Sequence, residues 1–239
     1  AEAVLDRARA LRKPVIAVLF SGRALIVPWL IDRADAVLAA WFPGSEAGNA
    51  LADLLMGRVS PSGRTPVSWP CAMGQLPLFY GQRPSGRPGD PLDRFTSKYL
   101  DAPDAPLFAF GHGLTYGEFA LSNLRVTADR VSEEDRVEIL VDVANRGART
   151  AEETVFLFTR DRLASLARPL LELKGCGKIS LNPGQSGTVR LFLDGRELRF
   201  LGPDLEPVFE PGEVEILVGP CADRSRLLVA TIHLVPPRP

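Results

Sequence analysis

The second half of the chain is a series of short apolar runs separated by turn sequences, and this pattern constrains the fold more than any other feature. The runs cover residues 121–126, 136–145, 153–160, 170–181, 187–194, 212–219 and 226–234. Within residues 137–143 every second side chain is Val or Ile, so these side chains share one face of an extended strand. Glycine-containing turns at 145–147, 182–184 and 210–212 follow or precede individual runs. Short strands at this spacing, without a helical period, predict an all-β sandwich of the immunoglobulin or fibronectin type III kind.

The first part of the chain has a different pattern, in which helical segments alternate with continuous apolar strands. We expect helices over residues 3–11, around Pro28 and over 46–56, and strands over 15–20 and 36–42. The two strand segments are typical of strands buried on both faces of a parallel sheet. Gly57 is expected to end the third helix in a left-handed conformation. The alternation predicts the C-terminal portion of a mostly parallel α/β sandwich, and we expect its remaining strands to come from chain absent from this sequence.

The patterns divide the chain into an α/β part over residues 1–80, a long connecting loop over 81–119 and the β sandwich over 120–239. The connecting loop is dominated by Pro, Gly and charged residues. A structureless loop of this length is uncommon unless it is functional or disordered. Tyr80, Phe95 and Tyr99 argue against disorder, because aromatic side chains in such a loop usually dock on a surface.

Charge and composition exclude several classes of function. The 28 basic and 29 acidic residues nearly balance, and no basic stripe interleaved with aromatics is present, so nucleic acid is not an expected partner. Only His112 and His233 offer imidazole ligands, which excludes a histidine-rich metal site, and we expect no cofactor. No apolar run reaches the roughly 18 residues that a membrane helix needs. The sequence lacks an initiator Met and starts within a helical pattern, so we expect a fragment or a processed chain.

Glu46 is the first candidate for chemistry, because it lies between a Pro-Gly turn and the start of a helix. The helix dipole favours a carboxylate in the first turn by about 0.3–1 kcal/mol, and Ser45 is a suitable N-cap, so Glu46 has a complete structural explanation. The helix start could also hold a polar ligand through its backbone N–H groups. No G-x-S-x-G motif occurs, which argues against a Ser-His-Asp hydrolase. His112 is expected to be packed, and Asp142 to face solvent.

The connecting loop contains a second group of candidates, Arg94, Phe95, Lys98 and Tyr99. Two cations alternating with two aromatic rings suit carbohydrate, because rings stack on sugars and charged groups hydrogen-bond to hydroxyls. The alternative is that these side chains pin the loop to the surface of the domain. The sequence leaves both interpretations open.

Several longer motifs resemble one family of enzymes. They are "AAWFPGSEAGNALADLLMGRVSPSGRTPVSWP", "GQLPLFYGQRPSGRP", "FTSKYLD" and "PLFAFGHGLTY", followed by "RPLLELKGCGKISLNPGQSGTVRLFLD" and "FEPGEVEILVGP". In this order they closely resemble glycoside hydrolase family 3, in its bacterial β-glucosidase branch, over essentially the whole chain. The resemblance implies three domains, a TIM-like barrel, an α/β sandwich and a fibronectin type III-like domain. This chain would hold the end of the second domain and all of the third.

The resemblance also implies retaining hydrolysis by an aspartate nucleophile and a glutamate acid/base, whose carboxyl groups lie about 5–5.5 Å apart. In the family the nucleophile belongs to the barrel, in an S-D-aromatic context, and the acid/base to a loop upstream of the first strand seen here. No S-D-aromatic tripeptide occurs in this sequence. Ser45-Glu46 belongs to a later helix motif, and the "SEEDR" of residues 132–136 lies in the β half. We therefore expect no catalytic residue in this chain and no activity from it alone.

The expected function is that of the C-terminal portion of a retaining β-glucosidase acting on terminal non-reducing β-D-glucosyl residues of cello-oligosaccharides or aryl glucosides. It would need the barrel portion, either as a separate chain or as a part deleted from this sequence. The alternatives are a β-xylosidase, an α-L-arabinosidase, or a non-catalytic structural or interaction module. Arg94, Phe95, Lys98 and Glu46 would then lie at the mouth of the substrate pocket or at a subunit contact, with a homodimer left open. A periplasmic or secreted location is expected, with no membrane and no metal.

Overall fold

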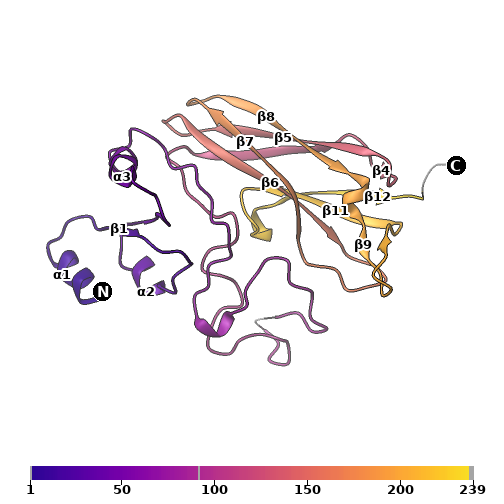
Figure 1. The fold of residues 1–239 in the computed structure, drawn as a ribbon, viewed down its shortest axis with the longest axis horizontal. Coiled ribbons are helices and arrows are strands. Elements are labelled where there is room, and N and C mark those ends of the chain that lie inside the picture. The colour runs from indigo at the N-terminus through magenta and orange to yellow at the C-terminus, as the bar shows by residue number, and fades with distance from the viewer. Residues whose placement is uncertain (1, 91, 237–239) are drawn as a thin grey trace.

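A computed structural model describes residues 2–90 and 92–236 and consists of a helix-and-strand unit at one end and a larger β sandwich at the other (Figure 1). Pro91 of the predicted connecting loop, and Ala1 and residues 237–239 of the two predicted domains, lie outside the described residues. An irregular segment, described over residues 56–90 and 92–118 and purple to magenta in Figure 1, joins the two parts and runs along the side of the sandwich.

The N-terminal unit has the predicted order of helices and strands. Its elements are α1 (Glu2–Ala10), β1 (Ile16–Leu19), α2 (Pro28–Ile31), β2 (Ala36–Ala39) and α3 (Ala47–Leu55). β1 and β2 pair in parallel, with Ile16 opposite Ala36. Gly57, just beyond α3, has a φ of 69°, which confirms the predicted left-handed end of this helix. The α/β interpretation of this part is confirmed.

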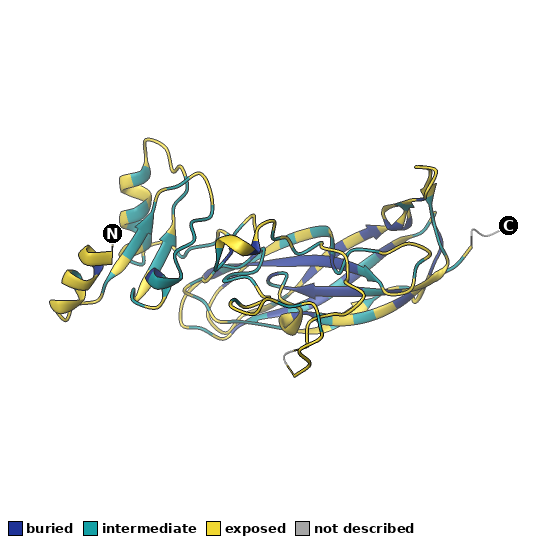
Figure 2. Cartoon of the chain, turned by 90° about the horizontal axis from the view of Figure 1, so that it is seen from below, coloured by how far each residue is buried: buried dark blue, intermediate teal, exposed yellow. Residues whose placement is uncertain are grey.

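The predicted burial of both strand faces is wrong for the part of the chain that the structure describes. β1 and β2 form a sheet of only two strands, and Ile16 and Phe20 are 49% and 57% exposed. α3 has no buried residue, and Figure 2 shows mostly exposed and half-buried residues throughout this unit. The strands have the composition of buried strands, but among the described residues their surroundings leave every residue of β1 and β2 half-buried or exposed.

The second part is a sandwich of two sheets, and it contains every strand that the apolar runs predict. One sheet has the order β4-β12-β11-β6-β7 and the other the order β3-β5-β8. The strands are β3 (Phe119–Val126), β4 (Arg130–Val131), β5 (Arg136–Asn145), β6 (Ala151–Asp161), β7 (Glu172–Leu181), β8 (Ser186–Asp194), β9 (Phe200–Leu201), β10 (Pro207–Val208), β11 (Gly212–Gly219) and β12 (Leu228–Leu234), with short 3₁₀ helices η1 (Met73–Gln75), η2 (Gly195–Leu198) and η3 (Arg224–Arg226). β4, β9 and β10 have two residues each, and a run this short shows no alternation that could predict it.

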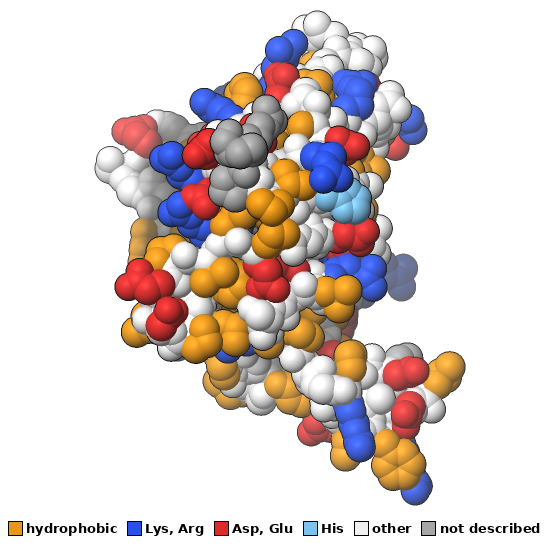
Figure 3. Space-filling model, turned by 90° about the vertical axis from the view of Figure 1, so that its right-hand side faces the viewer, with side chains coloured by type: hydrophobic (Ala, Val, Ile, Leu, Met, Phe, Trp, Pro, Cys, Tyr) orange, Lys and Arg blue, Asp and Glu red, His pale blue; other side chains and the backbone are white. Residues whose placement is uncertain are grey.

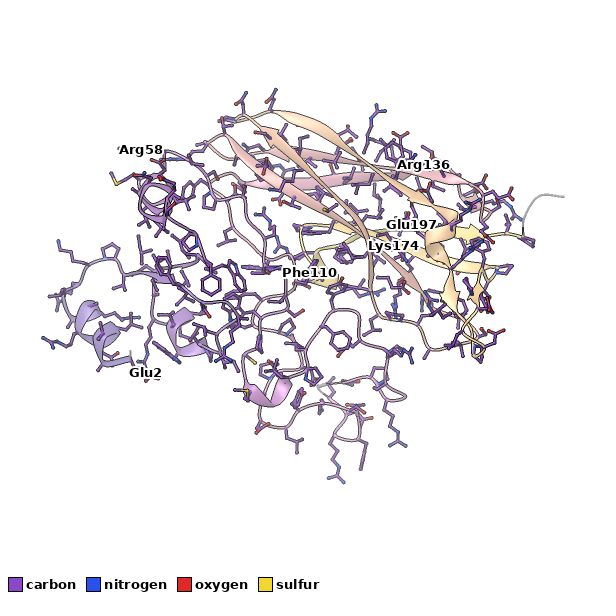
Figure 4. All side chains as sticks on the ribbon, viewed as in Figure 1. Glu2, Arg58, Phe110, Arg136, Lys174 and Glu197 are labelled. Carbon is purple, nitrogen blue, oxygen red and sulfur yellow. The ribbon has the colours of Figure 1, made fainter. Side chains whose placement is uncertain are left out.

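Two buried clusters lie on opposite faces of β6. The inward Val and Ile side chains of residues 137–143 are at most 1% exposed, which confirms the predicted core face of β5, and they pack with alternate residues of β6. On the other face of β6, Phe156 and Phe158 form a second cluster, against which Tyr80 and Phe110 of the irregular segment pack. Figure 4 labels Phe110 where the irregular segment meets the sandwich. The irregular segment therefore covers the outer face of the sandwich at β6.

Candidate functional site

The irregular segment contains a loop that is closed at its base by backbone pairing. Trp69 pairs antiparallel with Phe108, and the Trp69 N–H donates to the Phe108 carbonyl at 2.7 Å. Closer to the sandwich, the Thr65 N–H donates to the His112 carbonyl at 2.9 Å. Residues 65–75 and 105–112 thus form a paired stem, which fixes where the loop leaves the protein surface and where it returns.

Gln75 closes the outer end of this stem. Its side chain is 2% exposed, and its Nε2 donates to the Pro103 and Ala105 carbonyls at 2.7 and 3.0 Å. Its Oε1 accepts from the backbone N–H groups of Cys71 and Ala72 at 2.7 and 3.4 Å. The amide uses its full hydrogen-bonding capacity, and one side chain thereby joins both arms of the stem.

Beyond the stem, residues 81–104 form a projection that we call the finger. The Thr96 hydroxyl donates to the Asp93 carbonyl at 2.8 Å and accepts from the Asp90 N–H at 2.9 Å. The Ser97 N–H donates to the Arg87 carbonyl at 3.0 Å. Although its described residues form no helix or strand, the finger is held in one conformation by these local polar contacts.

Three of the predicted site residues, Arg94, Phe95 and Lys98, lie together on the finger. The Arg94 guanidinium stacks on the Phe95 ring at 4.6 Å, and Phe95 is 66% exposed. The Lys98 ammonium donates to the Asp90 and Asp93 carbonyls at 2.6 and 3.0 Å, so it holds the turn at the tip. Figure 3 shows the finger projecting at the lower right, with apolar, basic and acidic side chains on its surface.

The three aromatic residues that argue against disorder have different environments. The Tyr80 ring lies 4.7 Å from that of Phe110 and 5.7 Å from that of Phe158, and burial raises the pKa of its hydroxyl. The Tyr99 hydroxyl donates to a stem carbonyl at 3.1 Å. Phe95 remains largely exposed. The expectation that these aromatics dock therefore holds for Tyr80 and Tyr99 and not for Phe95.

Glu46, the fourth predicted site residue, lies at the start of α3 and away from the finger (Figure 1). It occupies the N-cap position itself, without a side-chain capping bond, and its Oε2 accepts from the Asn49 amide at 2.7 Å. The prediction that Ser45 caps this helix is wrong. The left-handed Gly44 (φ 74°) and a hydrogen bond from the Ala47 N–H to the Gly44 carbonyl form a turn, after which the helix begins.

The residues that join the irregular segment to its neighbours are ones that the sequence pattern does not single out. Arg64 Nη2 lies 2.6 Å from Glu153 Oε1, and the two side chains are only 6% and 9% exposed. Tyr116 and Arg149 donate to the carbonyls of Leu54, in the last turn of α3, and of Gly57, just beyond it, at 2.6 and 2.7 Å. These partners are distant in sequence and belong to no local motif, so nothing in a single sequence pairs them.

His112 is packed into the stem. Its ring stacks on Phe108 with centroids 4.5 Å apart. Burial lowers its pKa, and the nearby cations Arg226 and Arg64 lower it further. A histidine held neutral in this way agrees with the packing role that its glycine-flanked position suggests.

Asp142 lies on the outer face of the β3-β5-β8 sheet, where it accepts from both Arg125 Nη atoms at 3.0 and 2.7 Å. Hydrogen bonds from Arg125, Asn123 and Thr188 hold the pKa of this carboxyl well below its usual range. Within residues 2–90 and 92–236, no group of His, Cys, Asp and Glu side chains has the arrangement to bind a metal ion. None of the described helices is long and apolar enough to cross a membrane.

Comparisons with known proteins find relatives of both halves of the chain. The profile of the glycosyl hydrolase family 3 C-terminal domain matches residues 1–116, and that of the fibronectin type III-like domain matches residues 153–222. A periplasmic β-glucosidase from Salmonella typhimurium is 35% identical over 95% of this chain and 30% of its own length. A β-xylosidase from Formosa agariphila is 36% identical over 87% of this chain and 28% of its own length.

The fold is also similar to that of a solved enzyme. The crystal structure of a β-glucosidase from Listeria innocua superposes with a TM-score of 0.90 at 34% sequence identity, covering 97% of this chain and 32% of the other. The chain thus spans between 28% and 30% of the length of the curated relatives named above.

Proposed function

The chain belongs to glycoside hydrolase family 3, and we propose that it forms the C-terminal part of a retaining β-glucosidase. The observation that carries this proposal is the similarity to the Listeria innocua β-glucosidase over 97% of the chain, which corresponds to 32% of that enzyme. In this proposal the nucleophile aspartate and the acid/base glutamate belong to the rest of the enzyme, about 5–5.5 Å apart as retaining hydrolysis requires. Residues 1–80 complete the α/β sandwich domain, 81–119 connect, and 120–239 form the fibronectin type III-like domain.

The uncovered apolar surface of the N-terminal unit supports this assignment. Ile16, Phe20, Phe42, Leu55 and Met56 are between 43% and 82% exposed. Soluble proteins rarely leave a large apolar surface uncovered, and a two-stranded sheet has open edges that invite pairing. Further strands and helices of the same sandwich domain, supplied with the barrel portion of the enzyme, would cover this surface.

We propose terminal non-reducing β-D-glucosyl residues of cello-oligosaccharides or aryl glucosides as the substrates. The names of the Salmonella and Listeria relatives support a glucoside. The Listeria enzyme has been solved with glucose, and a mutant of it with laminaribiose. Two β-xylosidase relatives, one named as putative, are 34% and 36% identical, which makes a β-xyloside the second candidate. The name of the Salmonella relative also supports a periplasmic location.

The finger is proposed to shape the mouth of the substrate pocket or a contact with a second subunit. An exposed Phe95 ring suits stacking on a sugar, and the adjacent Arg94 guanidinium offers donors to sugar hydroxyls. Lys98 supports the turn that presents them. Glu46 is proposed to organise the start of α3 at a domain interface.

The first test is intact mass and chain identification of the purified active protein, with assays on aryl β-D-glucoside, aryl β-D-xyloside, cellobiose and laminaribiose. We expect activity only when the barrel portion is present, and a preference for glucosides. Turnover by the 239-residue chain alone would show that a catalytic carboxylate has been overlooked here. Cleavage of the xyloside without the glucoside would replace the first candidate by the second.

The proposed role of the finger is tested separately with Arg94→Ala and Phe95→Ala in the complete enzyme. Arg83→Ala, at an exposed position of the same finger, is the matched control. We expect a raised KM or a changed oligomeric state in the first two variants only. If KM, kcat and assembly stay as in the wild type, the finger does not contact substrate or subunit.

A further inference from the structure

The described residues of the finger form no buried hydrophobic core. Its two leucines, Leu92 and Leu100, are 95% and 93% exposed. Its hydrogen bonds near the tip hold its local shape, but they cannot set its direction relative to the rest of the protein. The direction must come from the contacts that attach the finger to the rest of the protein. Besides the hydrogen bond from the Tyr99 hydroxyl to the Gly74 carbonyl at 3.1 Å, these are two attachments, one at each end of the finger.

The first attachment is at Tyr80, where the finger leaves the sandwich. The Tyr80 ring is part of the buried aromatic cluster on the outer face of β6. Immediately beyond it, the Leu170 N–H donates to the Gln82 carbonyl at 2.9 Å. A Cβ atom on Gly81 would lie only 3.3 Å from the Leu171 carbonyl oxygen, so the backbone of the finger lies directly against the β6–β7 connection.

The second attachment is the Gln75 amide, where the finger returns. Its two donated hydrogen bonds satisfy the carbonyls of Pro103 and Ala105, at the end of the finger. The side chain is 2% exposed, so water does not replace these bonds without opening the stem. A buried polar group that loses its partner pays its full desolvation penalty, which makes this a strong constraint on the loop.

We propose that Gln75 and Tyr80 are positioning residues that hold the finger in a preformed orientation on the fibronectin type III-like sandwich. Through them the sandwich sets the affinity for the part of the substrate that lies outside the cleaved sugar. This effect on substrate affinity rests on the proposed location of the finger at the pocket mouth. The sandwich thereby supports the finger, because Tyr80, directly before the finger, packs on the cluster of Phe156 and Phe158.

The test of positioning uses Gln75→Glu in the complete enzyme. This change keeps the size and the acceptor oxygen of the side chain and removes the amide nitrogen that supplies both donors. Gln82→Glu makes the same chemical change at an exposed side chain of the finger and serves as the control. Trypsin cleavage after Arg94 or Lys98, located by mass spectrometry, should be about tenfold faster in Gln75→Glu and unchanged in Gln82→Glu, because the open loop is the form that is cut. Arg83 and Arg87 are each followed by proline and are not cut.

A second pair of variants keeps the test decisive if Gln75→Glu does not fold. Tyr80→Ala removes the ring from the aromatic cluster, whereas Tyr80→Phe keeps the ring. We expect faster cleavage of the finger in Tyr80→Ala and the wild-type rate in Tyr80→Phe. Unchanged cleavage in both Gln75→Glu and Tyr80→Ala overturns the positioning role, whatever the kinetics show.

The link to substrate is read from kinetics on the same variants. We expect the KM for cellotriose to rise several-fold at unchanged kcat in Gln75→Glu, while the inhibition constant of glucose, which occupies only the cleaved-sugar position, stays the same. A general structural defect would change both constants. If the finger is cut faster and the KM for cellotriose does not move, the pocket-mouth role of the finger is wrong, although its attachment through Gln75 stands. A wild-type enzyme without β-glucosidase activity would instead overturn the proposed function itself.

Discussion

Replacing Glu153 with Gln is expected to destabilise the protein by about 3–5 kcal/mol, because the buried Arg64 guanidinium is left without its counter-charge. The two side chains are 6% and 9% exposed, and Arg64 Nη2 lies 2.6 Å from Glu153 Oε1. The same carboxylate oxygen accepts the Thr154 N–H at 2.9 Å, which a glutamine oxygen can still accept. An exposed ion pair contributes only about 0–1 kcal/mol, so the burial of this pair sets the magnitude.

The measurement is urea unfolding at neutral pH, followed by circular dichroism of the sandwich, with the free energy taken from the midpoint and slope. Glu152→Gln is the matched control, because the neighbouring Glu152 pairs with Lys178 at 2.7 Å with side chains 36% and 50% exposed. Its loss should change stability by no more than about 1 kcal/mol. If Glu153→Gln is no more destabilising than this control, the inference from burial is refuted.

The double variant Arg64→Met with Glu153→Leu separates two quantities. One is the net contribution of the ion pair to the free energy of unfolding, and the other is the cost of leaving one buried charge unpaired. Replacing a buried ion pair by apolar side chains of similar size is often close to neutral. We therefore expect the double variant to be more stable than Glu153→Gln. A double variant at least as unstable as the single one would mean that the ion pair contributes net stability beyond the penalty of an unpaired charge.

Further predictions concern pH and close packing. Burial lowers the folded-state pKa of His112. The free energy of unfolding should therefore be constant above about pH 6.5 and fall as the pH drops from there towards the folded pKa. Urea titrations at several pH values should show that His112→Phe removes this dependence. Burial raises the pKa of Asp161, so its contribution to stability is lost as the pH rises through the folded pKa, and Asp161→Asn should raise the melting temperature at pH 7. Gly111 has a φ of 83°, and its Cβ would lie 2.8 Å from the Phe156 ring and 3.1 Å from Cys221 Cα, so Gly111→Ala should be destabilising by at least about 1 kcal/mol. Gly63→Ala, which meets nothing within 4 Å, is its control.

The fold could be predicted from the sequence where one face of an element is buried and the other is not. Residues 137–143 show this plainly, because β5 has the core on one side and solvent on the other. β6 shows no such alternation, since residues 153–159 are all buried. Its outer face is covered by Tyr80 and Phe110 of the irregular segment, and local periodicity carries no information about a cover supplied by such a distant part of the chain.

The candidate site was harder to predict than the fold for a related reason. The composition of the finger pointed to Arg94, Phe95 and Lys98, and the structure places all three on one projection. The residue that closes the stem, Gln75, lies in a loop without periodicity, and its partners are carbonyl groups, which carry no sequence signal. Side-chain bonds to backbone across a loop depend on geometry alone, so a single sequence does not disclose them.

β6 contributes both to the core of the sandwich and to the support of the finger. One face of this strand completes the core between the two sheets, and the other carries Phe156 and Phe158, on which Tyr80 packs. Near its start, Glu153 holds Arg64 of the irregular segment. Because the same strand supports both clusters, weakening the outer cluster should release the finger before it unfolds the sandwich, whereas weakening the inner core should do both. The N-terminal unit is different: α3 is bonded to the rest of the chain through carbonyls at and just beyond its C-terminal end, and none of its residues is fully buried. In the proposed function, the remainder of the α/β domain would stabilise this unit, whereas the proposed positioning role makes the order of the finger depend on the sandwich.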